Sequence, residues 1–343
     1  MKEQSKVLMI YTGGTIGMVE DVASKALHPF DFSQITQEIP ELNKLNCKIT
    51  TIAFETPLDS SDVSTKDWNK LAGIIKKNYT NYDGFLILHG TDTMAYTASA
   101  LSFMLEGLNK PVILTGSQLP IGVLRTDGKE NILTAIEIAS DKDENGKPKV
   151  AEVAIYFEYK LIRGNRAHKT STMHFDAFNS PNFRDLAEAG VTIEYKNHHI
   201  QPFGNGELNV VELQEQGIFI LPVFPGMAED QVASVLTSTR NWAILLITFG
   251  AGNVPMLPWF LNALKTAIKA DKVIVNITQC DKGKVNMSLY ENGRILKDIG
   301  IIGGYDITSE AALTKLMYLK EKNLTVAALK SQFETPLRGE MTL

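Results

Sequence analysis

Three turns combine glycine with hydroxyl, carboxyl or amide side chains, and each follows a short apolar run. They read Thr-Gly-Gly-Thr-Ile-Gly at 12–17, His-Gly-Thr-Asp-Thr at 89–93 and Thr-Gly-Ser-Gln at 115–118. Glycine allows tight turns and lets a backbone approach a ligand closely. One such turn is also compatible with ordinary helix capping, since Thr and Asp are common N-cap residues. Three together favour a functional site.

The spacing of these residues does not fit the common nucleotide or metal sites. Residues 13–17 lack the Lys-Ser/Thr pair that completes a phosphate-binding loop, and their glycines do not have dinucleotide-site spacing. His168 and His174 lie on either side of residues 170–173, and the adjacent pair at 198–199 has no Cys or carboxylate neighbour, so we expect no zinc site. A site without metal or cofactor remains, in which a threonine hydroxyl attacks the substrate and an adjacent base activates it.

The segments around the turns predict how they are positioned. Short Val/Ile/Leu-rich runs without strict alternation are typical of strands buried on both faces of a parallel sheet. They cover residues 6–11, 85–88, 111–114, 150–157, 218–224, 243–247 and 273–277. Helical spacing follows a Ser64-x-x-Asp67 cap signal and recurs over 94–108, 132–139, 259–269 and 310–320. The alternation predicts an α/β fold whose three turns share the carboxyl edge of one sheet.

The length of 343 residues suits two domains. A polar stretch with Pro202 and Gly-Asn-Gly at 204–206 predicts the connection between them. We therefore expect an N-terminal domain over 1–190, a linker over 191–216 and a C-terminal domain over 217–343.

Charge and cysteine content indicate the surroundings of the protein. The net charge is −5, and no long charge run would attract nucleic acid or a membrane surface. Cys47 and Cys280 are too few for a disulfide scaffold and fit a reducing compartment. The first apolar run is shorter than a secretory h-region, and none approaches a membrane span. We expect a cytoplasmic protein.

The turns resemble the two signatures of L-asparaginases, in Thr-Gly-Gly-Thr-Ile-Gly-Met at 12–18 and Leu-His-Gly-Thr-Asp-Thr-Met at 88–94. Resemblance to the cytoplasmic (type I) bacterial branch lies at 59–62, 115–118, 163–166 and 276–280. It implies conversion of L-asparagine and water to L-aspartate and ammonia, without a cofactor. It also implies a larger N-terminal parallel-sheet domain and a smaller flavodoxin-like C-terminal domain, in a homodimer or homotetramer with sites at subunit interfaces.

The resemblance assigns roles to individual residues. Thr15 would attack the side-chain amide and form a β-aspartyl ester. Lys169 would deprotonate or position the Thr91 hydroxyl, and Asp92 would receive the α-ammonium group. The residues that would hold the α-carboxylate are Asp59, Ser60 and Ser61. A zwitterionic substrate does need an anion for its ammonium and donors for its carboxylate. Without the resemblance, Lys169 is compatible with an ordinary surface lysine.

One departure from the family concerns a tyrosine. Many members carry a tyrosine after the first signature, where it contacts the nucleophilic threonine. Residues 18–78 contain none, and Leu27 or a neighbour stands in its place. Tyr290 lies in a stretch, 285–293, that resembles one contributed by an adjacent subunit in other cytoplasmic members. The resemblance therefore implies that Tyr290 of one chain reaches Thr15 of another; the alternative is a half-buried structural tyrosine.

A second departure concerns regulation. Some cytoplasmic members bind asparagine at an additional effector site, and Cys280 fits that pattern. Ile247 stands where an arginine would be expected and His168 where a threonine would be. Loss of the arginine removes a carboxylate clamp, so we do not expect cooperativity.

Three other functions remain open at this point. The amidase component of a tRNA-dependent amidotransferase would need an RNA-binding domain and a basic surface. A non-catalytic amino-acid-binding protein would need Asp92 and Ser60 but neither Thr15 nor Lys169. An N-terminal-threonine hydrolase would be cleaved before Thr91 or Thr15.

Overall fold

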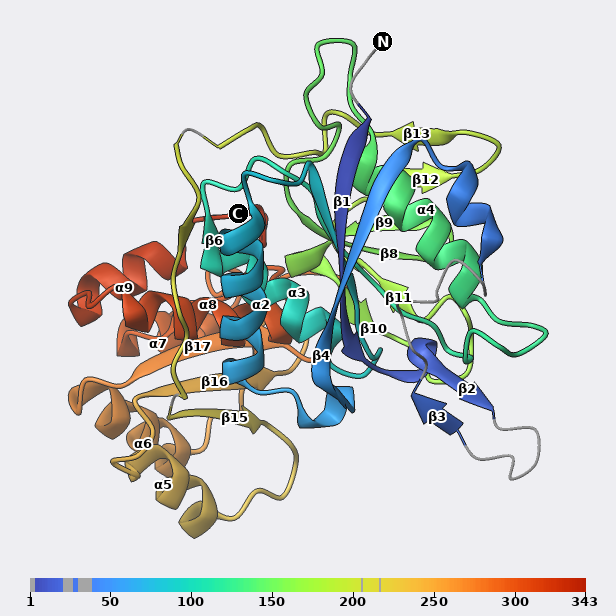
Figure 1. Cartoon of the computed structure of the whole chain (residues 1–343). Helices are drawn as coiled ribbons and strands as arrows, with labels where there is room; N and C mark the ends of the chain where they lie inside the picture. Colours follow the sequence, from blue (N-terminus) through green and yellow to red (C-terminus); the bar gives the residue numbers. More distant parts are fainter. Residues whose placement is uncertain (1–3, 21–26, 30–38, 205, 216) are drawn as a thin grey trace. The chain divides into compact units, whose positions relative to one another are not determined.

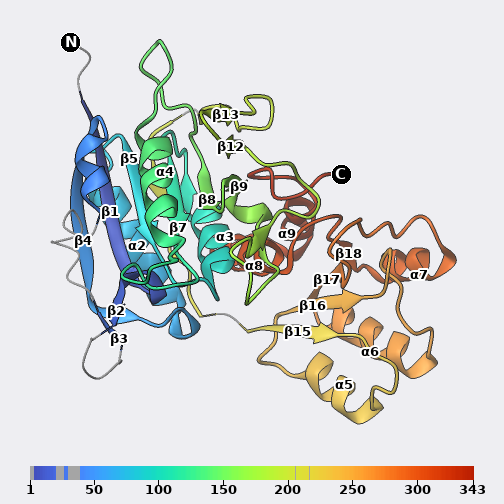
Figure 2. The ribbon, with the colours of Figure 1, turned by 90° about the vertical axis from the view of Figure 1, so that its right-hand side faces the viewer.

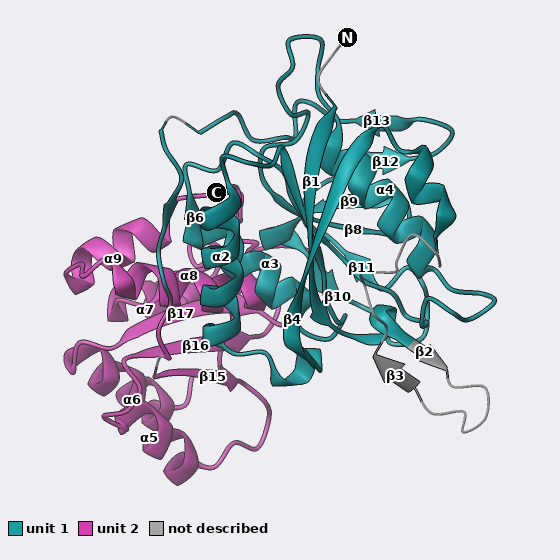
Figure 3. Cartoon of the chain, viewed as in Figure 1, with its two compact units in different colours: residues 1–212 teal, residues 213–343 magenta. Residues whose placement is uncertain are grey.

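The chain forms two compact units, Met1–Glu212 and Leu213–Leu343 (Figure 3). The structure, a computed structural model, describes residues 4–20, 27–29, 39–204, 206–215 and 217–343 (Figure 1). The division falls near the end of the expected linker, so most of 191–216 belongs to unit 1. There β13 (Ile193–Tyr195) pairs with β12 (Ala187–Ala189), and β14 (Asn209–Val210) pairs with β6 (Leu105–Glu106).

Unit 1 is built on an eight-stranded sheet in the order β13-β12-β9-β8-β7-β5-β1-β4. Figure 2 shows this sheet with β4 at one edge. The strands from β8 to β4 are parallel, and those from β9 to β13 are antiparallel. The remaining sheet strands are β1 (Ser5–Gly13), β4 (Cys47–Leu58), β5 (Gly84–Leu88), β7 (Val112–Thr115), β8 (Val153–Phe157) and β9 (Lys160–Arg163).

Helices cover both faces of this sheet. Helix α4 (Gly128–Ser140) packs on the face that holds Val7, Met9 and Tyr11, and α2 (Thr65–Asn78) and α3 (Met94–Met104) lie on the opposite side (Figure 1). The capping box predicted at Ser64 and Asp67 is confirmed, because each side chain bonds the other residue's backbone N–H. Short elements complete the unit: η1 (Thr15–Gly17), β2 (Met18–Glu20), β3 (Leu27–Pro29), η3 (Pro40–Lys44), η4 (Ser60–Asp62), η5 (Gly164–Arg166), β10 (His168–Lys169) and β11 (Phe178–Asn179).

Unit 2 contains a parallel sheet in the sequential order β15-β16-β17-β18. Its core joins Leu246 of β16 to Phe260 of α6 and Leu296 of α7, and Figure 2 shows α5 and α6 on one side of the sheet. The elements are β15 (Ile218–Pro222), α5 (Glu229–Thr237), β16 (Ala243–Thr248), α6 (Pro258–Lys269), β17 (Val273–Thr278), α7 (Glu291–Ile299), β18 (Ile302–Gly303), α8 (Ser309–Glu321) and α9 (Val326–Phe333). The prediction of two α/β domains, the second smaller, is confirmed.

The structure differs from the predicted elements in several places, two of which have a clear physical reason. The helix expected over 94–108 ends at Met104, because the chain turns into β6 and Gly107 adopts φ +70 where a Cβ atom would lie 2.7 Å from the Glu207 carbonyl oxygen. β4 was not predicted, because it is an edge strand whose residues are mostly half-buried or exposed. Within the described residues, no helix is long and apolar enough to cross a membrane.

Candidate active site

The three turns lie at one edge of the unit 1 sheet, as predicted. They follow β1, β5 and β7, and β1 and β5 are parallel neighbours with Tyr11 opposite Leu88. The end of β4, on the other side of β1, adds residues 59–61 to the same edge. Side chains from these four strand ends therefore converge, although up to about 40 residues separate consecutive segments along the chain.

Two glycines bring the first two turns into contact. A Cβ atom on Gly14, whose φ is +90, would lie 2.5 Å from the Gly90 Cα atom and 2.6 Å from its nitrogen. A Cβ atom on Gly90 would lie 2.6 Å from Ser60 Oγ. No other residue type fits this approach, because backbone atoms cannot move aside as flexible side chains do. Thr15 and Thr91 each follow one of the touching glycines, so their hydroxyls are held in one neighbourhood.

Thr91, Asp92 and Lys169 form one hydrogen-bonded group. Lys169 Nζ lies 2.8 Å from Thr91 Oγ1 and 2.5 Å from Asp92 Oδ1. The Lys169 side chain is 16% exposed, whereas that of Asp92 is 63% exposed. The lysine is therefore shielded behind a carboxylate that remains open to an incoming cation. The surface-lysine alternative for Lys169 does not describe this geometry.

The local fold explains how Lys169 reaches the group. It lies on β10, which pairs antiparallel with β11 so that Lys169 is opposite Phe178. The preceding turn, η5, is fully buried. A short strand anchored at both ends fixes the lysine stem, and only its tip extends toward Thr91.

Ser60 connects the end of β4 to the second turn. Its buried Oγ accepts a hydrogen bond of 3.3 Å from the Asp92 N–H, and its carbonyl oxygen accepts one of 2.6 Å from Thr93 Oγ1. Asp59 and Ser61 are exposed beside it. The Asp59 carboxylate accepts hydrogen bonds from the N–H and hydroxyl of Ser61, and these hold the pKa of Asp59 below its ordinary value. The three predicted carboxylate-binding residues thus form one turn.

His89 stabilises the second turn through a hydrogen bond to its backbone. Its ring is buried, and its Nδ1 lies 2.7 Å from the Gly90 carbonyl oxygen. Because a carbonyl oxygen only accepts, Nδ1 carries the proton, and Nε2 accepts from Thr97 Oγ1 at 2.9 Å. Trp68 Nε1 donates to the same threonine at 2.9 Å. Burial lowers the pKa of His89, so the imidazole is neutral near pH 7.

Thr15 occupies the first position of η1 and is half-buried. In the part of the chain that the structure describes, its hydroxyl makes no hydrogen bond, so no base for it is identified within that part. The side chain of Leu27, which stands where many members have a tyrosine, lies outside the described residues.

Tyr290, predicted to act across a subunit boundary, lies in unit 2. It is the N-cap residue of α7 and is 54% exposed, beside Leu289, which is 55% exposed. The prediction that Tyr290 approaches Thr15 of another chain is not tested by a single chain.

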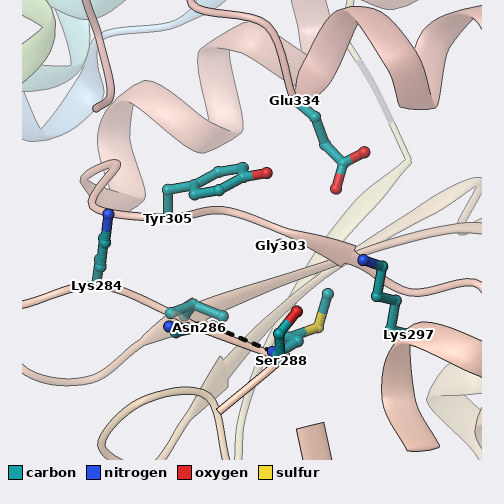
Figure 4. Close-up of a pocket in the computed structure, with 9 residues that line it drawn as sticks. Lys284, Asn286, Ser288, Lys297, Gly303, Tyr305 and Glu334 are labelled. Carbon is teal, nitrogen blue, oxygen red and sulfur yellow. Dashed lines mark hydrogen bonds between the residues drawn. The ribbon is translucent and has the colours of Figure 1, made fainter. Parts of the chain in front are cut away.

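Unit 2 also contains a pocket of about 170 Å³ near this segment (Figure 4). Figure 4 shows Tyr305, Glu334 and Lys297 directed toward its centre. Its polar walls are mostly exposed, and none of the predicted site residues lines it. The positions considered for an effector site, Ile247 on β16 and the exposed Cys280 after β17, do not line it either.

Two residues in the candidate site had no predicted role. Gln118, at the end of β7, lies with its Oε1 3.5 Å from Thr91 Oγ1. His89 fixes the carbonyl that precedes Thr91. Both stand in the motifs used to predict the site, but the spacing of a motif does not show which member faces inward. Among the described residues, no group of three or more His, Cys, Asp or Glu side chains is arranged to hold a metal ion.

Comparisons with known proteins identify the family of the chain. Residues 6–201 match the family "Asparaginase, N-terminal", and residues 217–333 match "Glutaminase/Asparaginase C-terminal domain". L-asparaginase 1 of Escherichia coli (strain K12) is 43% identical over 341 residues, which cover 99% of each chain. The crystal structure of L-asparaginase I from Vibrio cholerae has a TM-score of 0.90 at 41% identity, covering 99% of this chain and 100% of that one. The thermostable L-asparaginase from Thermococcus kodakarensis has a TM-score of 0.89 at 30% identity, covering 98% and 99%. With two family models spanning most of its length and full-length relatives above 40% identity, this chain belongs to the asparaginase family.

Proposed function

We propose that the protein hydrolyses L-asparagine to L-aspartate and ammonia through a covalent ester on Thr15. The observation that carries this proposal is the group of Thr91, Asp92 and Lys169 beside the turn that presents Thr15. A threonine nucleophile and a lysine–threonine pair supply the groups needed to form the ester and then to hydrolyse it.

In the first step, Thr15 Oγ attacks the carbon of the substrate's side-chain amide. The threonine loses its proton, the carbon–nitrogen bond breaks, and nitrogen leaves as ammonia after gaining that proton. In the second step, water attacks the ester carbon, and the Thr15 oxygen leaves and is reprotonated. Thr91 Oγ1 takes a proton from the attacking water as its own hydroxyl proton passes to the neutral amine of Lys169. Net consumption is one water for each amide hydrolysed.

The charges of the site suit a zwitterion. Asp92 presents an exposed carboxylate for the α-ammonium group. In the turn that contains Asp59, Ser60 and Ser61, the Ser60 hydroxyl can donate to the α-carboxylate, whereas the N–H and hydroxyl of Ser61 donate to Asp59. Charge-assisted hydrogen bonds at both ends hold the side-chain amide in a fixed place, and this fixed placement favours reaction at the amide carbon.

The direct test is ammonia release from asparagine, from glutamine and from buffer alone, without added RNA. We expect release from asparagine by the wild type and loss of at least 100-fold in kcat for Thr15→Ala with unchanged circular dichroism. A tRNA requirement would favour the amidotransferase alternative. Binding of asparagine without ammonia release would favour the binding-protein alternative. Two bands on a denaturing gel would favour a self-cleaved threonine hydrolase.

We also propose a shared site in a homodimer or homotetramer, with Tyr290 of one chain assisting Thr15 of another. In a two-fold dimer this contribution is reciprocal. Thr15→Ala and Tyr290→Phe should each be nearly inactive alone. If they are refolded together and pair at random, about a quarter of all sites should be intact by symmetry. No recovery, despite mixed dimers of well-folded parents, would place Tyr290 within its own chain or outside the reaction.

We expect the protein to act in the cytoplasm. Cys47 is buried, Cys280 is exposed, and both are free thiols. An exposed free thiol is stable as such in a reducing compartment. Fractionation of cells that express the untagged protein tests this expectation.

A further inference from the structure

We propose that Gln118 is a positioning residue that sets the direction of the Thr91 hydroxyl proton, and that Asp127 holds Gln118 in place. The inference rests on the proposed function, because the Thr91 hydroxyl matters only if it takes part in proton transfer. Gln118 lies at the end of β7 and Asp127 immediately before α4.

The Thr91 hydroxyl has a single proton to donate. Thr91 Oγ1 has two neighbours, Lys169 Nζ at 2.8 Å and Gln118 Oε1 at 3.5 Å. An ammonium group can only donate, and an amide oxygen can only accept. While Lys169 is protonated, Thr91 therefore accepts from the lysine and directs its own proton to Gln118. When Lys169 loses a proton, Nζ becomes an acceptor and the hydroxyl proton can turn toward it.

The Gln118 amide is oriented by a second contact. Its Nε2 donates to the His174 carbonyl oxygen at 3.1 Å. Since that carbonyl can only accept, the NH2 group must face His174 and Oε1 must face Thr91. The contact between Oε1 and Thr91 is long for a hydrogen bond, as contacts in unliganded sites often are before substrate tightens them.

The backbone of the turn is bonded to Asp127. The Asp127 carboxylate is 8% exposed and accepts the N–H groups of Gln118, at 3.0 and 3.1 Å, and of Leu119, at 3.1 Å. Asn131 donates to the same carboxylate at 3.3 Å and to the Gly116 carbonyl at 3.0 Å. Hydrogen bonds to a carboxylate are about twice as strong as neutral ones. Asp127 thus holds the N–H groups of Gln118 and Leu119, while Asn131 links this carboxylate to the Gly116 carbonyl at the start of the turn.

The first test is substitution of Gln118 itself. Gln118→Met removes the acceptor at similar length, and we expect kcat to fall about 3- to 10-fold, with KM within twofold, because one weak hydrogen bond in the reacting group is lost. Gln118→Glu places a negative charge beside the Thr91–Lys169 pair. A nearby anion favours the ammonium form, so the acidic limb of the kcat/KM profile should move to higher pH.

Asp92 is the charged group in contact with Lys169, and it is the same in both variants. A shift that appears with Gln118→Glu and not with Gln118→Met is therefore due to the new carboxylate. Wild-type kinetics in both variants, including an unmoved acidic limb, would overturn the inference.

The second test asks whether Asp127 acts through Gln118. Asp127→Asn should lower kcat several-fold in the wild-type background and have little further effect in the Gln118→Met background. A merely structural role predicts the same loss in both backgrounds and would overturn the assignment of Asp127. The matched control is Thr126→Val, which removes a 3.1 Å bond to the Leu119 carbonyl and a 3.0 Å bond from the Gly128 N–H in the same loop but no bond to Gln118. If Asp127→Asn does not fold, Asp127→Glu is measured in its place. The Gln118 variants then still decide the role of Gln118.

Different results would contradict the proposed function and the role of Gln118. Wild-type protein without ammonia release, or full activity in Thr15→Ala, contradicts the proposed function. An active wild type that depends on Thr15, combined with indifferent Gln118 variants, contradicts only the present inference.

Discussion

The ion pair between Lys315 and Glu340 allows a quantitative prediction for unit 2. Both side chains are 0% exposed, and Lys315 Nζ lies 2.5 Å from Glu340 Oε1. Lys315 also donates to the carbonyl oxygens of Phe333 and Thr335 at 2.6 and 2.8 Å. Burial of the ammonium lowers the pKa of Lys315, while Glu340 partly offsets this. Glu340→Gln keeps the shape of the side chain but removes the counter-charge.

The cost of this change can be bounded. Removing one partner of a buried pair destabilises proteins by about 3–5 kcal/mol. The lysine can avoid a buried charge by losing its proton, which at pH 7 costs about 4.6 kcal/mol from an ordinary pKa of about 10.4. At pH 9 the same deprotonation costs only about 1.9 kcal/mol. A lysine whose pKa is lowered on folding makes stability rise with pH up to its unfolded pKa. The deficit of Glu340→Gln relative to wild type should therefore shrink from about 3–5 kcal/mol at pH 7 to about 2 kcal/mol or less at pH 9.

Urea unfolding followed by tryptophan fluorescence at both pH values measures this deficit, since Trp242 and Trp259 lie in unit 2. Glu334→Gln makes the same chemical change at a half-buried site and should cost less than about 0.5 kcal/mol. Lys315→Met with Glu340→Leu should recover only part of the loss, because no charge remains buried but the carbonyl groups of Phe333 and Thr335 and the N–H groups of Leu337 and Arg338 lose their partners. A deficit below about 1 kcal/mol at pH 7, or one that does not change by pH 9, would refute the reasoning.

Three further predictions concern unit 1. Lys169→Met should lower kcat by at least about 100-fold with little change in KM. Asp92→Asn should also raise KM, because it removes the counter-charge of the substrate's ammonium group. Steady-state kinetics that are the same for the two variants would count against these roles. Burial lowers the pKa of His89, so protonation favours the unfolded chain, and the wild type should lose stability as the pH falls below about 6.5. His89→Gln should remove this loss. Unfolding free energies at pH 7 and 5.5 measure it, and an equal pH dependence in both proteins would disprove the prediction. Gly14→Ala should lower kcat about 100-fold or more by pushing the Gly14 turn away from Gly90, and a variant with wild-type activity would show that this close approach is not required.

The sequence predicts the central strands of both units because their apolar runs are continuous. β5 and β7 are buried at every residue, and such strands need no alternation to be identified. β4 lacks this signal: only Cys47 and Phe54 are buried along it, since it forms the edge of the sheet. Its place beside β1 depends on a pairing between residues about 40 positions apart, which no local pattern records.

In the candidate site, too, local motifs were predictable from the sequence and long-range contacts were not. The hydroxyl and carboxyl groups of Thr91 and Asp92 stand in a motif that predicts their place at the sheet edge. The link to Lys169 crosses 78 residues and came only from family resemblance. Gln118 and His89 were visible as motif members, but their partners, Thr91 and the Gly90 carbonyl, are known only once the chain is folded.

The strand that presents Thr15 also places a demand on synthesis of the protein. β1 is buried at every residue except Lys6, and its two partners are β4 and β5, which are made later. At about 5–20 residues per second, a ribosome needs roughly 4–15 seconds to extend the chain from Gly13 to Leu88. During that interval the nascent chain carries an apolar strand with neither partner strand complete, which is a hazard for self-association. The central position that fixes Thr15 in the folded protein therefore makes its strand a segment that needs protection during translation.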